Sequence, residues 1–170
     1  MKKQILATLV LVISVFATAT AADKKTADCS TSKMITLNTG FSKLVVEGNV
    51  DVVLFEDGSE SEIRTFGNNS DVAATSITQK DGVLTIKNNH TKGEKVLVYV
   101  PVSHLAIIEA NGNSKVSSAS VLQSQQLTLV VKGDCKFSIQ AAGNIDVVQD
   151  GEVEMLVEKN TTSVRATPQS

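Results

Sequence analysis

Two histidines are the first residues to consider for acid–base or metal chemistry. His90 lies in the polar segment Asn88–Gly93, which is typical of a turn, and His104 directly precedes Leu105. A histidine that activates a nucleophile needs that nucleophile close by, and no Gly-rich or Ser-rich nucleophile elbow surrounds either histidine. Two histidines without Cys or Glu at ligand spacing do not make a zinc site. We therefore expect solvated histidines, no metal site, no cofactor and no catalytic residue.

Carboxylates gather in one short run, formed by Glu56, Asp57, Glu60 and Glu62. Paired carboxylates carry out glycoside hydrolysis, and clustered carboxylates bind calcium. The run has the composition of a solvated turn, and the Gly-Gly-x-Gly-x-Asp repeat of calcium-binding solenoids is absent from the sequence. It therefore predicts neither an acid pair nor a calcium site.

The two cysteines, Cys29 and Cys135, are the third source of chemistry. In an oxidising compartment two thiols favour one disulfide. However, Cys29 lies in the polar segment Asp23–Ser32, and nothing in the sequence places it within bonding distance of Cys135. A Cys29–Cys135 disulfide and two free or intermolecular thiols both stay open. A lipid anchor on Cys29 is disfavoured, because Asp28 precedes it where lipoprotein processing needs small residues.

The start of the chain has the pattern of a secretory signal peptide. Met1–Gln4 is positively charged, Ile5–Phe16 is apolar, and Ala17–Ala22 supplies the small residues that signal peptidase requires. The apolar run is shorter than the roughly 20 residues that span a bilayer. We expect a cleaved leader over residues 1–22 and no transmembrane anchor. The chain would then act in the periplasm, on the outer surface or outside the cell.

Composition narrows the function of the remaining chain. With 170 residues the protein is long enough for one domain with a proper core. The net charge of −2 excludes a nucleic-acid binder that depends on neutralising phosphates. Aromatic residues make up 4% of the chain and tryptophan is absent, so we expect few ring platforms for stacking on sugars or bases.

Strands must position whatever site the chain carries. From Met34 onward apolar residues alternate with polar ones at a period of two, as in Val50–Leu54, Val83–Lys87 and Val96–Val102. Segments rich in Gly, Asn and Asp separate these runs and predict turns at Glu56–Ser59, Gly67–Ser70, Lys80–Gly82 and Asn88–Gly93. No segment after the leader has helical periodicity. The sequence therefore predicts an all-β fold.

Four glycines begin segments of one pattern: glycine, polar, variable, charged, apolar. These turn glycines are Gly48, Gly112, Gly133 and Gly151. The last three are 21 and 18 residues apart, and a period near 20 residues is typical of stacked β-solenoid coils. In such a stack the apolar residue of each segment points inward, which predicts one column of Val52, Val116, Phe137 and Met155. The charged residues predict an outward column of Lys115, Lys136 and Glu154.

The segment Gly40–Leu54, with its early Phe and its Gly-Asn-Val-Asp-Val turn, resembles the opening of the head GIN-domain family of auto-transporter adhesins. That family is common among exported proteins of Bacteroidetes. The resemblance continues through Asp81–Ile86 and Val98–Leu105 and covers residues 38–158. It implies a right-handed parallel β-helix-like solenoid and an adhesin without established catalytic residues. An antiparallel β-sandwich is the alternative fold.

The resulting domain division has four parts: a signal peptide over residues 1–22, a linker over 23–37, a GIN-like β-solenoid domain over 38–158 and a flexible tail over 159–170. We expect a non-catalytic domain of the cell envelope, an adhesin or scaffold that binds an envelope protein or glycan and self-associates through the ends of the solenoid. The alternative is a β-helix lyase or hydrolase acting on polysaccharides, which would need several carboxylates clustered on one coil face.

Overall fold

The computed structural model describes residues 31–37, 40–57, 61–90, 93–150, 154–157 and 164–168, and from residue 150 onward it describes the backbone alone. Within these residues the chain is almost entirely β-strand, with one short helix. The elements in chain order are β1 (Thr31–Thr36), β2 (Lys43–Gly48), β3 (Val50–Glu56), β4 (Glu62–Gly67), α1 (Asn69–Ala74), β5 (Thr75–Lys80), β6 (Val83–Asn88), β7 (Val96–Val102), β8 (Ile107–Asn111), β9 (Lys115–Ser118), β10 (Gln126–Lys132), β11 (Lys136–Ile139), β12 (Asn144–Asp150), β13 (Glu154–Val157) and β14 (Val164–Pro168). The predicted all-β class is confirmed.

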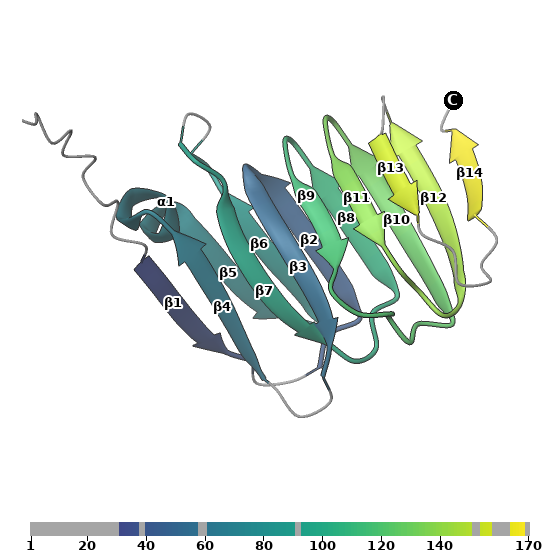
Figure 1. The fold of residues 1–170 in the computed structure, drawn as a ribbon, viewed down its shortest axis with the longest axis horizontal. Helices are drawn as coiled ribbons and strands as arrows, with labels where there is room; N and C mark the ends of the chain where they lie inside the picture. Colours follow the sequence, from purple (N-terminus) through teal and green to yellow (C-terminus); the bar gives the residue numbers. More distant parts are fainter. Residues whose placement is uncertain are drawn as a thin grey trace, which may run out of the picture.

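The strands form two mixed sheets of seven strands each, which lie one in front of the other in Figure 1. Sheet A has the order β1-β4-β7-β3-β9-β11-β13, and sheet B has the order β14-β12-β10-β8-β2-β6-β5. Among the described pairs, β1–β4, β4–β7 and β5–β6 are antiparallel, and the others are parallel. A purely antiparallel β-sandwich is therefore wrong.

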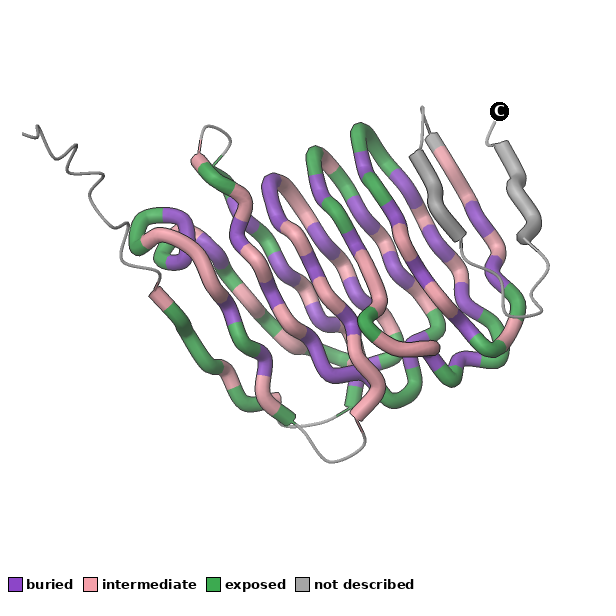
Figure 2. The backbone as a smooth tube through the Cα atoms, viewed as in Figure 1, coloured by how far each residue is buried: buried purple, intermediate pink, exposed green. Residues whose placement is uncertain are grey.

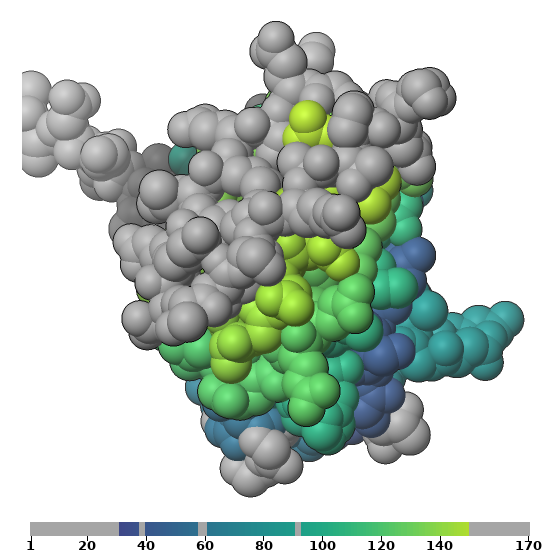
Figure 3. Space-filling model, turned by 90° about the vertical axis from the view of Figure 1, so that its right-hand side faces the viewer, coloured from purple at the N-terminus to yellow at the C-terminus, as the bar shows by residue number. Residues whose placement is uncertain are grey.

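From β7 to β14 the chain passes alternately between the two sheets. Each strand from β10 onward lies parallel to the strand two places earlier in the chain. Figure 3 looks at the molecule from the right-hand side of Figure 1, and its coloured residues form successive bands from yellow-green through green to blue. The C-terminal half is thus a regular stack, whereas the antiparallel pairs lie among the first seven strands.

Side chains that alternate along the strands fill the space between the sheets, and Figure 2 shows buried residues recurring along β2 to β12. The predicted inward column has the register found in sheet A. Val116 pairs with Val52 on one side and with Phe137 on the other, and Phe137 pairs with Met155. Val52, Val116 and Phe137 are buried. The side chain of Met155 lies outside the described part, so the column is confirmed for the first three.

The predicted outward column begins with the same strands. Lys115 pairs with Asp51 and with Lys136, and both lysines are exposed. Glu154 pairs with Lys136 through the backbone, and its side chain lies outside the described residues. The alternation of inward and outward residues is therefore in register from β3 to β11, as the repeat predicts.

Three of the four turn glycines lie directly against one another. Gly48, Gly112 and Gly133 have φ angles of +88°, +89° and +85°. A residue with a Cβ atom would be strained at such angles. A Cβ on Gly112 would lie 3.2 Å from the Gly48 Cα, and a Cβ on Gly133 would lie 3.3 Å from the Gly112 nitrogen. These glycines let successive turns contact backbone to backbone. Gly151 lies outside the described residues.

The helix α1 was not expected, because the sequence predicts a turn at Gly67–Ser70. The Asn68 side chain accepts a hydrogen bond of 3.0 Å from the backbone nitrogen of Asp71 and so caps the helix. Val72 packs into the core. Six residues are too few to show a helical period in the sequence. The helix is stabilised by the Asn68 cap and by the burial of Val72.

Strands also occur in the two segments predicted to be a linker and a flexible tail. Residues 31–36 of the predicted linker form β1, which pairs with β4, and residues 164–168 of the predicted tail form β14, which pairs with β12. The proposed signal peptide over residues 1–22 lies outside the described part. In the described part, no helix is long and apolar enough to cross a membrane.

Candidate binding face

The outer side of sheet A carries an unusual set of side chains on three neighbouring strands. Strand order places β4, β7 and β3 side by side, and each alternates buried and partly exposed residues. The outward positions of these strands hold mostly apolar or aromatic residues. We call this set the aromatic face, and it consists of Val53, Phe55, Arg64, Phe66, Leu97 and Tyr99.

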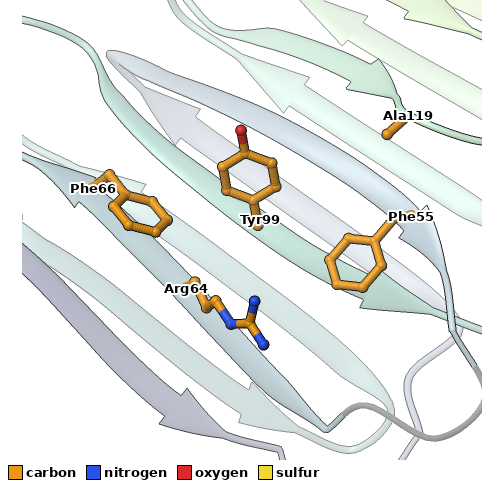
Figure 4. A pocket seen from close by; sticks show the side chains of 5 residues that line it. All are labelled: Phe55, Arg64, Phe66, Tyr99 and Ala119. Carbon is orange, nitrogen blue, oxygen red and sulfur yellow. The ribbon is translucent and has the colours of Figure 1, made fainter.

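An open pocket of about 430 Å³ lies on the aromatic face. Its lining is Phe55, Arg64, Phe66, Tyr99 and Ala119. The rings of Phe66 and Tyr99 meet edge to face, with 5.8 Å between their centroids and an interplanar angle of 90°. Figure 4 shows the Arg64 side chain extending from β4 in the direction of Phe55, with Phe66 and Tyr99 on its other side. Three rings and one guanidinium therefore share one hollow.

Strand pairing explains why these residues meet. Arg64 lies opposite Tyr99, because β4 pairs antiparallel with β7. Ala119 donates its backbone N–H to the Leu54 carbonyl at 2.8 Å, which places it beside Phe55. On the far side of β4, Met34 lies opposite Arg64 and is 61% exposed. The apolar surface thus extends from the pocket to the edge strand β1.

The few rings of the chain gather on this face, which composition alone did not indicate. The chain has five Phe, one Tyr and no Trp, and three of these six rings line the pocket. Phe41 and Phe137 are buried in the core, and Phe16 lies outside the described residues. All described Phe and Tyr rings that reach the surface therefore line this pocket. Sequence reasoning missed the site, although Arg64-Thr65-Phe66 and Val53-Leu54-Phe55 put large side chains at outward positions of the alternation.

The outer side of sheet B is different, because ion-paired side chains lie among its half-exposed aliphatic residues. Glu109 lies between two lysines, with Lys43 Nζ 2.7 Å and Lys132 Nζ 3.0 Å from its carboxylate oxygens. Hydrogen bonds from Lys43 and Lys132 hold the pKa of Glu109 below its ordinary value. Lys87 and Glu47 form a further pair at 3.0 Å. We call these five residues the charged face.

A smaller polar hollow of about 280 Å³ adjoins the stacked glycines. It is lined by Glu47, Gly48, Lys87, Asn88, Asn89, Asn111 and Gly112. The Lys87–Glu47 ion pair lies across it, so its charged groups already have partners. This hollow belongs to the turn stack.

His90 does not lie free in solvent, although its ring is half exposed. Its Nδ1 contacts the buried carboxylate of Asp71 in α1, and its backbone N–H donates to the Asn88 side chain at 2.7 Å. The hydrogen bond from His90 lowers the pKa of Asp71. A Cβ on Gly93 would lie 2.7 Å from the Asp71 Cγ, so the loop packs tightly on the carboxylate. This pair fastens the β6–β7 loop to α1. His104 is exposed.

The other residues that the sequence offered for chemistry are the two cysteines and the carboxylate run. Cys135 is buried, and its thiol lies 3.3 Å from the Gly112 carbonyl and 3.4 Å from the Ser114 hydroxyl. Cys29 lies outside the described residues, so the Cys29–Cys135 disulfide stays a prediction. Glu56 accepts a hydrogen bond of 2.6 Å from the Gln123 N–H rather than facing another carboxylate. The described residues contain no cluster of three or more His, Cys, Asp or Glu side chains that could hold a metal ion.

Fold and site together define an all-β protein of two mixed sheets with an aromatic pocket on one outer face. The sequence matches the family described as "Putative auto-transporter adhesin, head GIN domain" over residues 40–167. This chain belongs to that family, as the resemblance in the sequence indicated. No protein with a curated description matches the chain in sequence.

Two solved structures of similar fold come from species of Parabacteroides. One is titled a putative adhesin from Parabacteroides merdae ATCC 43184; it has a TM-score of 0.50 and 14% identity, and the match covers 81% of this chain and 96% of that one. Another is titled a putative lipid binding protein from Parabacteroides distasonis ATCC 8503, with a TM-score of 0.56, 10% identity and coverage of 82% and 72%. At such identities these structures show a shared fold.

Proposed function

We propose that the chain is an exported, non-catalytic binding module of the cell envelope that holds its partner through the aromatic face. The adhesin family supports a surface role, and the leader pattern of residues 1–22 supports export. One observation carries the proposal: all described Phe and Tyr rings outside the core line a single open pocket. Exposed apolar patches on protein domains mark interaction sites. Apolar surface in contact with water is unfavourable, and its free energy is lowered when a partner covers it.

The lining also supports binding rather than catalysis. Glycoside hydrolysis needs two carboxylates on either side of the bond that breaks. The described lining of the pocket supplies Arg64 as its charged residue and no carboxylate. A polysaccharide lyase or hydrolase would lack its acid and base there.

Binding to isolated cell envelopes of the source bacterium tests the proposal. We expect the double variant Phe66→Ala/Tyr99→Ala to raise the apparent Kd about tenfold or more, since large side chains at interface centres dominate affinity. The matched control Thr85→Ala/Thr128→Ala changes two half-exposed residues on the outer side of sheet B and should leave the Kd unchanged. Equal binding by wild type and the ring variant, with both folded by circular dichroism, would show that another surface binds.

We also propose that β8 to β14 form a right-handed β-solenoid that serves as the scaffold of this face. The parallel in-register pairs, the alternation between sheets and the stacked glycines support it. Parallel crossovers are right-handed in nearly all proteins. Deleting residues 112–132 would remove one repeat and let Gly133 take the place of Gly112. We expect this variant to unfold cooperatively, whereas deletion of residues 112–122 should prevent folding. Loss of folding in both variants would argue against the repeat.

A further inference from the structure

Strand β1 is an open edge of sheet A. In the described part of the chain it pairs with β4 on one side, and no strand pairs with its other side. It is the outermost strand at the left of Figure 1, and its residues are exposed or half-exposed along its whole length, as Figure 2 shows. An edge of this kind accepts a further strand through its unpaired backbone groups.

The hydrogen bonds to β4 show which residues offer these backbone groups. Leu37, directly after β1, donates its N–H to the Ser61 carbonyl at 2.6 Å. Hydrogen-bonded and non-hydrogen-bonded pairs alternate along an antiparallel ladder. Every second residue of β1, counted back from Leu37, therefore bonds to β4, and the residues between them direct their N–H and C=O groups to the open edge. These residues are Ser32, Met34 and Thr36.

Strand β1 also extends beyond sheet B. Consecutive strands of the chain lie in facing positions of the two sheets, as β2 and β3, β6 and β7, and each later pair up to β12 and β13 do. Matched in this way, β4 faces β5, the last strand of sheet B, and β1 has no counterpart. Lys33 lies on the core side of β1, opposite the buried Thr65, and is nevertheless exposed. Two molecules can therefore join through β1 while their B sheets stay apart.

The sequence of β1 is complementary to itself in one antiparallel register. If Met34 lies opposite Met34 of a second copy, Ser32 lies opposite Thr36, and all three open residues of each strand form hydrogen-bonded pairs. Ser–Thr and apolar cross-strand pairs are favourable. Lys33, the one charged residue of β1, then lies opposite Ile35, whereas a register centred on Lys33 would bring two lysines together. Lysines on edge strands oppose unspecific pairing, and this one selects the register centred on Met34.

We propose that two copies of this chain pair antiparallel through β1, with Met34 at the two-fold axis, and so join their A sheets into one continuous sheet. Such a contact uses the same surface of both copies and closes at the dimer. It covers part of Met34, which is 61% exposed in the single chain. One strand pair is a small interface, so we expect a weak dimer with a Kd of about 1–100 µM.

The dimer presents two aromatic faces on the same side. The two-fold axis of an antiparallel strand pair is perpendicular to the sheet, so the outer sides of both A sheets face the same way. Met34 lies opposite Arg64 of β4, so the paired strands also connect the apolar surfaces of the two copies. Two linked sites bind a surface more tightly than one, because the second contact is intramolecular. This gain rests on the proposed function of the aromatic face, whereas the pairing of β1 does not.

Sedimentation equilibrium of the purified chain over about 1–300 µM tests the pairing. We expect wild type to change from monomer to dimer across this range and Met34→Pro to remain a monomer, because proline removes an edge N–H that β4 does not use. Met34→Lys puts two lysines at the axis and should weaken the dimer about tenfold or more. The matched control Thr128→Lys adds the same charge to the outer side of sheet B and should dimerise like wild type. Circular dichroism and thermal unfolding of each variant check the fold.

Cross-linking tests the register. The two Met34 residues of a hydrogen-bonded pair would have Cα atoms about 5.5 Å apart, which is within reach of a disulfide. In a Cys29→Ser background we expect Met34→Cys to form disulfide-linked dimers on mild oxidation. Lys33→Cys is the matched control and should form none, because Lys33 lies opposite Ile35 in this register. The buried Cys135 is kept in both variants.

Three results would overturn the inference. One is a chain that stays monomeric up to about 300 µM, another is a dimer that persists in both Met34→Pro and Met34→Lys, and the third is equal cross-linking of Met34→Cys and Lys33→Cys. If the chain is monomeric and Met34→Pro loses envelope binding, β1 takes its added strand from an envelope protein, and pairing between copies is wrong.

The proposed function fails separately from this inference. If Phe66→Ala/Tyr99→Ala dimerises like wild type and binds envelopes unchanged, the aromatic face is not the binding site and the pairing of β1 stands. If the cross-linked Met34→Cys dimer binds envelopes no more tightly than Met34→Pro, attachment through two sites is wrong.

Discussion

The outer sides of the two sheets share one core and have opposite chemistry. On sheet B the outward lysines and carboxylates pair with each other, as Glu109 does with Lys43 and Lys132. On sheet A the outward positions of β3, β4 and β7 hold rings and aliphatic side chains around Arg64, and the ion pair of Lys95 with Asp51 lies beside them. A sheet face that satisfies its own charges has little to gain from a partner, whereas an exposed apolar face gains free energy when a partner covers it. The difference therefore points to sheet A as the side that binds.

The largest effect should come from the inward residue beside the aromatic face. Leu54 is fully buried, while its neighbour Phe55 points outward. We expect Leu54→Ala to lower the free energy of unfolding by about 2–5 kcal/mol and Phe55→Ala to lower it by about 1 kcal/mol. Urea denaturation of both variants measures this. An equal loss would mean that Phe55 serves the fold, and the comparison between the two faces would no longer hold.

The ring pair on the aromatic face should contribute a smaller, measurable coupling. Phe66 and Tyr99 meet edge to face, and such pairs stabilise by about 0.5–1.5 kcal/mol beyond the area they bury. A double-mutant cycle with Phe66→Leu and Tyr99→Leu should give a coupling energy in that range. A value near zero would show that the rings are held by their strands and not by each other.

The charged face should respond to salt where the aromatic face does not. Glu109→Gln removes both ion pairs of this carboxylate, and pairs at a surface are worth about 0–1 kcal/mol each. We expect the destabilisation to be present at low ionic strength and to shrink in about 1 M salt, where charges are screened within about 3 Å. Denaturation of Phe66→Leu under the two conditions is the control, because its loss should not depend on salt.

Acid pH gives the smallest and most specific test. The pKa of Glu109 is lowered from its ordinary value of 4.5, and the pKa of Asp71 from 3.8. Each carboxylate therefore stabilises the folded state above its ordinary pKa, and this stabilisation is lost as the pH falls through the lowered value. We expect Glu109→Gln to reduce the fall in stability below about pH 4.5 and Asp71→Asn to reduce it below about pH 3.8. If Glu109→Gln leaves the loss of stability at acid pH unchanged, Lys43 and Lys132 do not favour the ionised form of Glu109.

Sequence patterns predicted the regular half of this protein because its determinants are local. Each turn needs a glycine at one fixed place, and the residues after it then fall inward or outward, which gave the register of Val52, Val116 and Phe137. The strand order β4-β7-β3 has no such local cause. It depends on β4 turning back antiparallel beside β7, and nothing in the spacing of Phe55, Phe66 and Tyr99 indicates that they meet.

The contact between His90 and Asp71 shows the same limit. His90 lies in a polar loop that is typical of a solvated turn, and Asp71 belongs to a helix formed by the Asn68 cap. A pattern of six residues does not predict that helix, so the carboxylate it buries was not predicted either. Composition did not predict the aromatic face either. A low number of Phe and Tyr residues does not show that half of their rings line one pocket.

The reversed strands at one end of the molecule limit where a further parallel repeat could be added. Because β4 runs against β7 and β5 runs against β6, a new parallel repeat has no matching neighbour on that side. On the other side, β11 and β12 each accept a further parallel strand in sequence order. Duplication of a repeat at the C-terminal side would therefore yield a longer homologue with an unchanged aromatic face. Loss of a repeat on that side would yield a shorter homologue with the same face. Members of such a lineage would differ in reach while the end that carries the three rings stays the same.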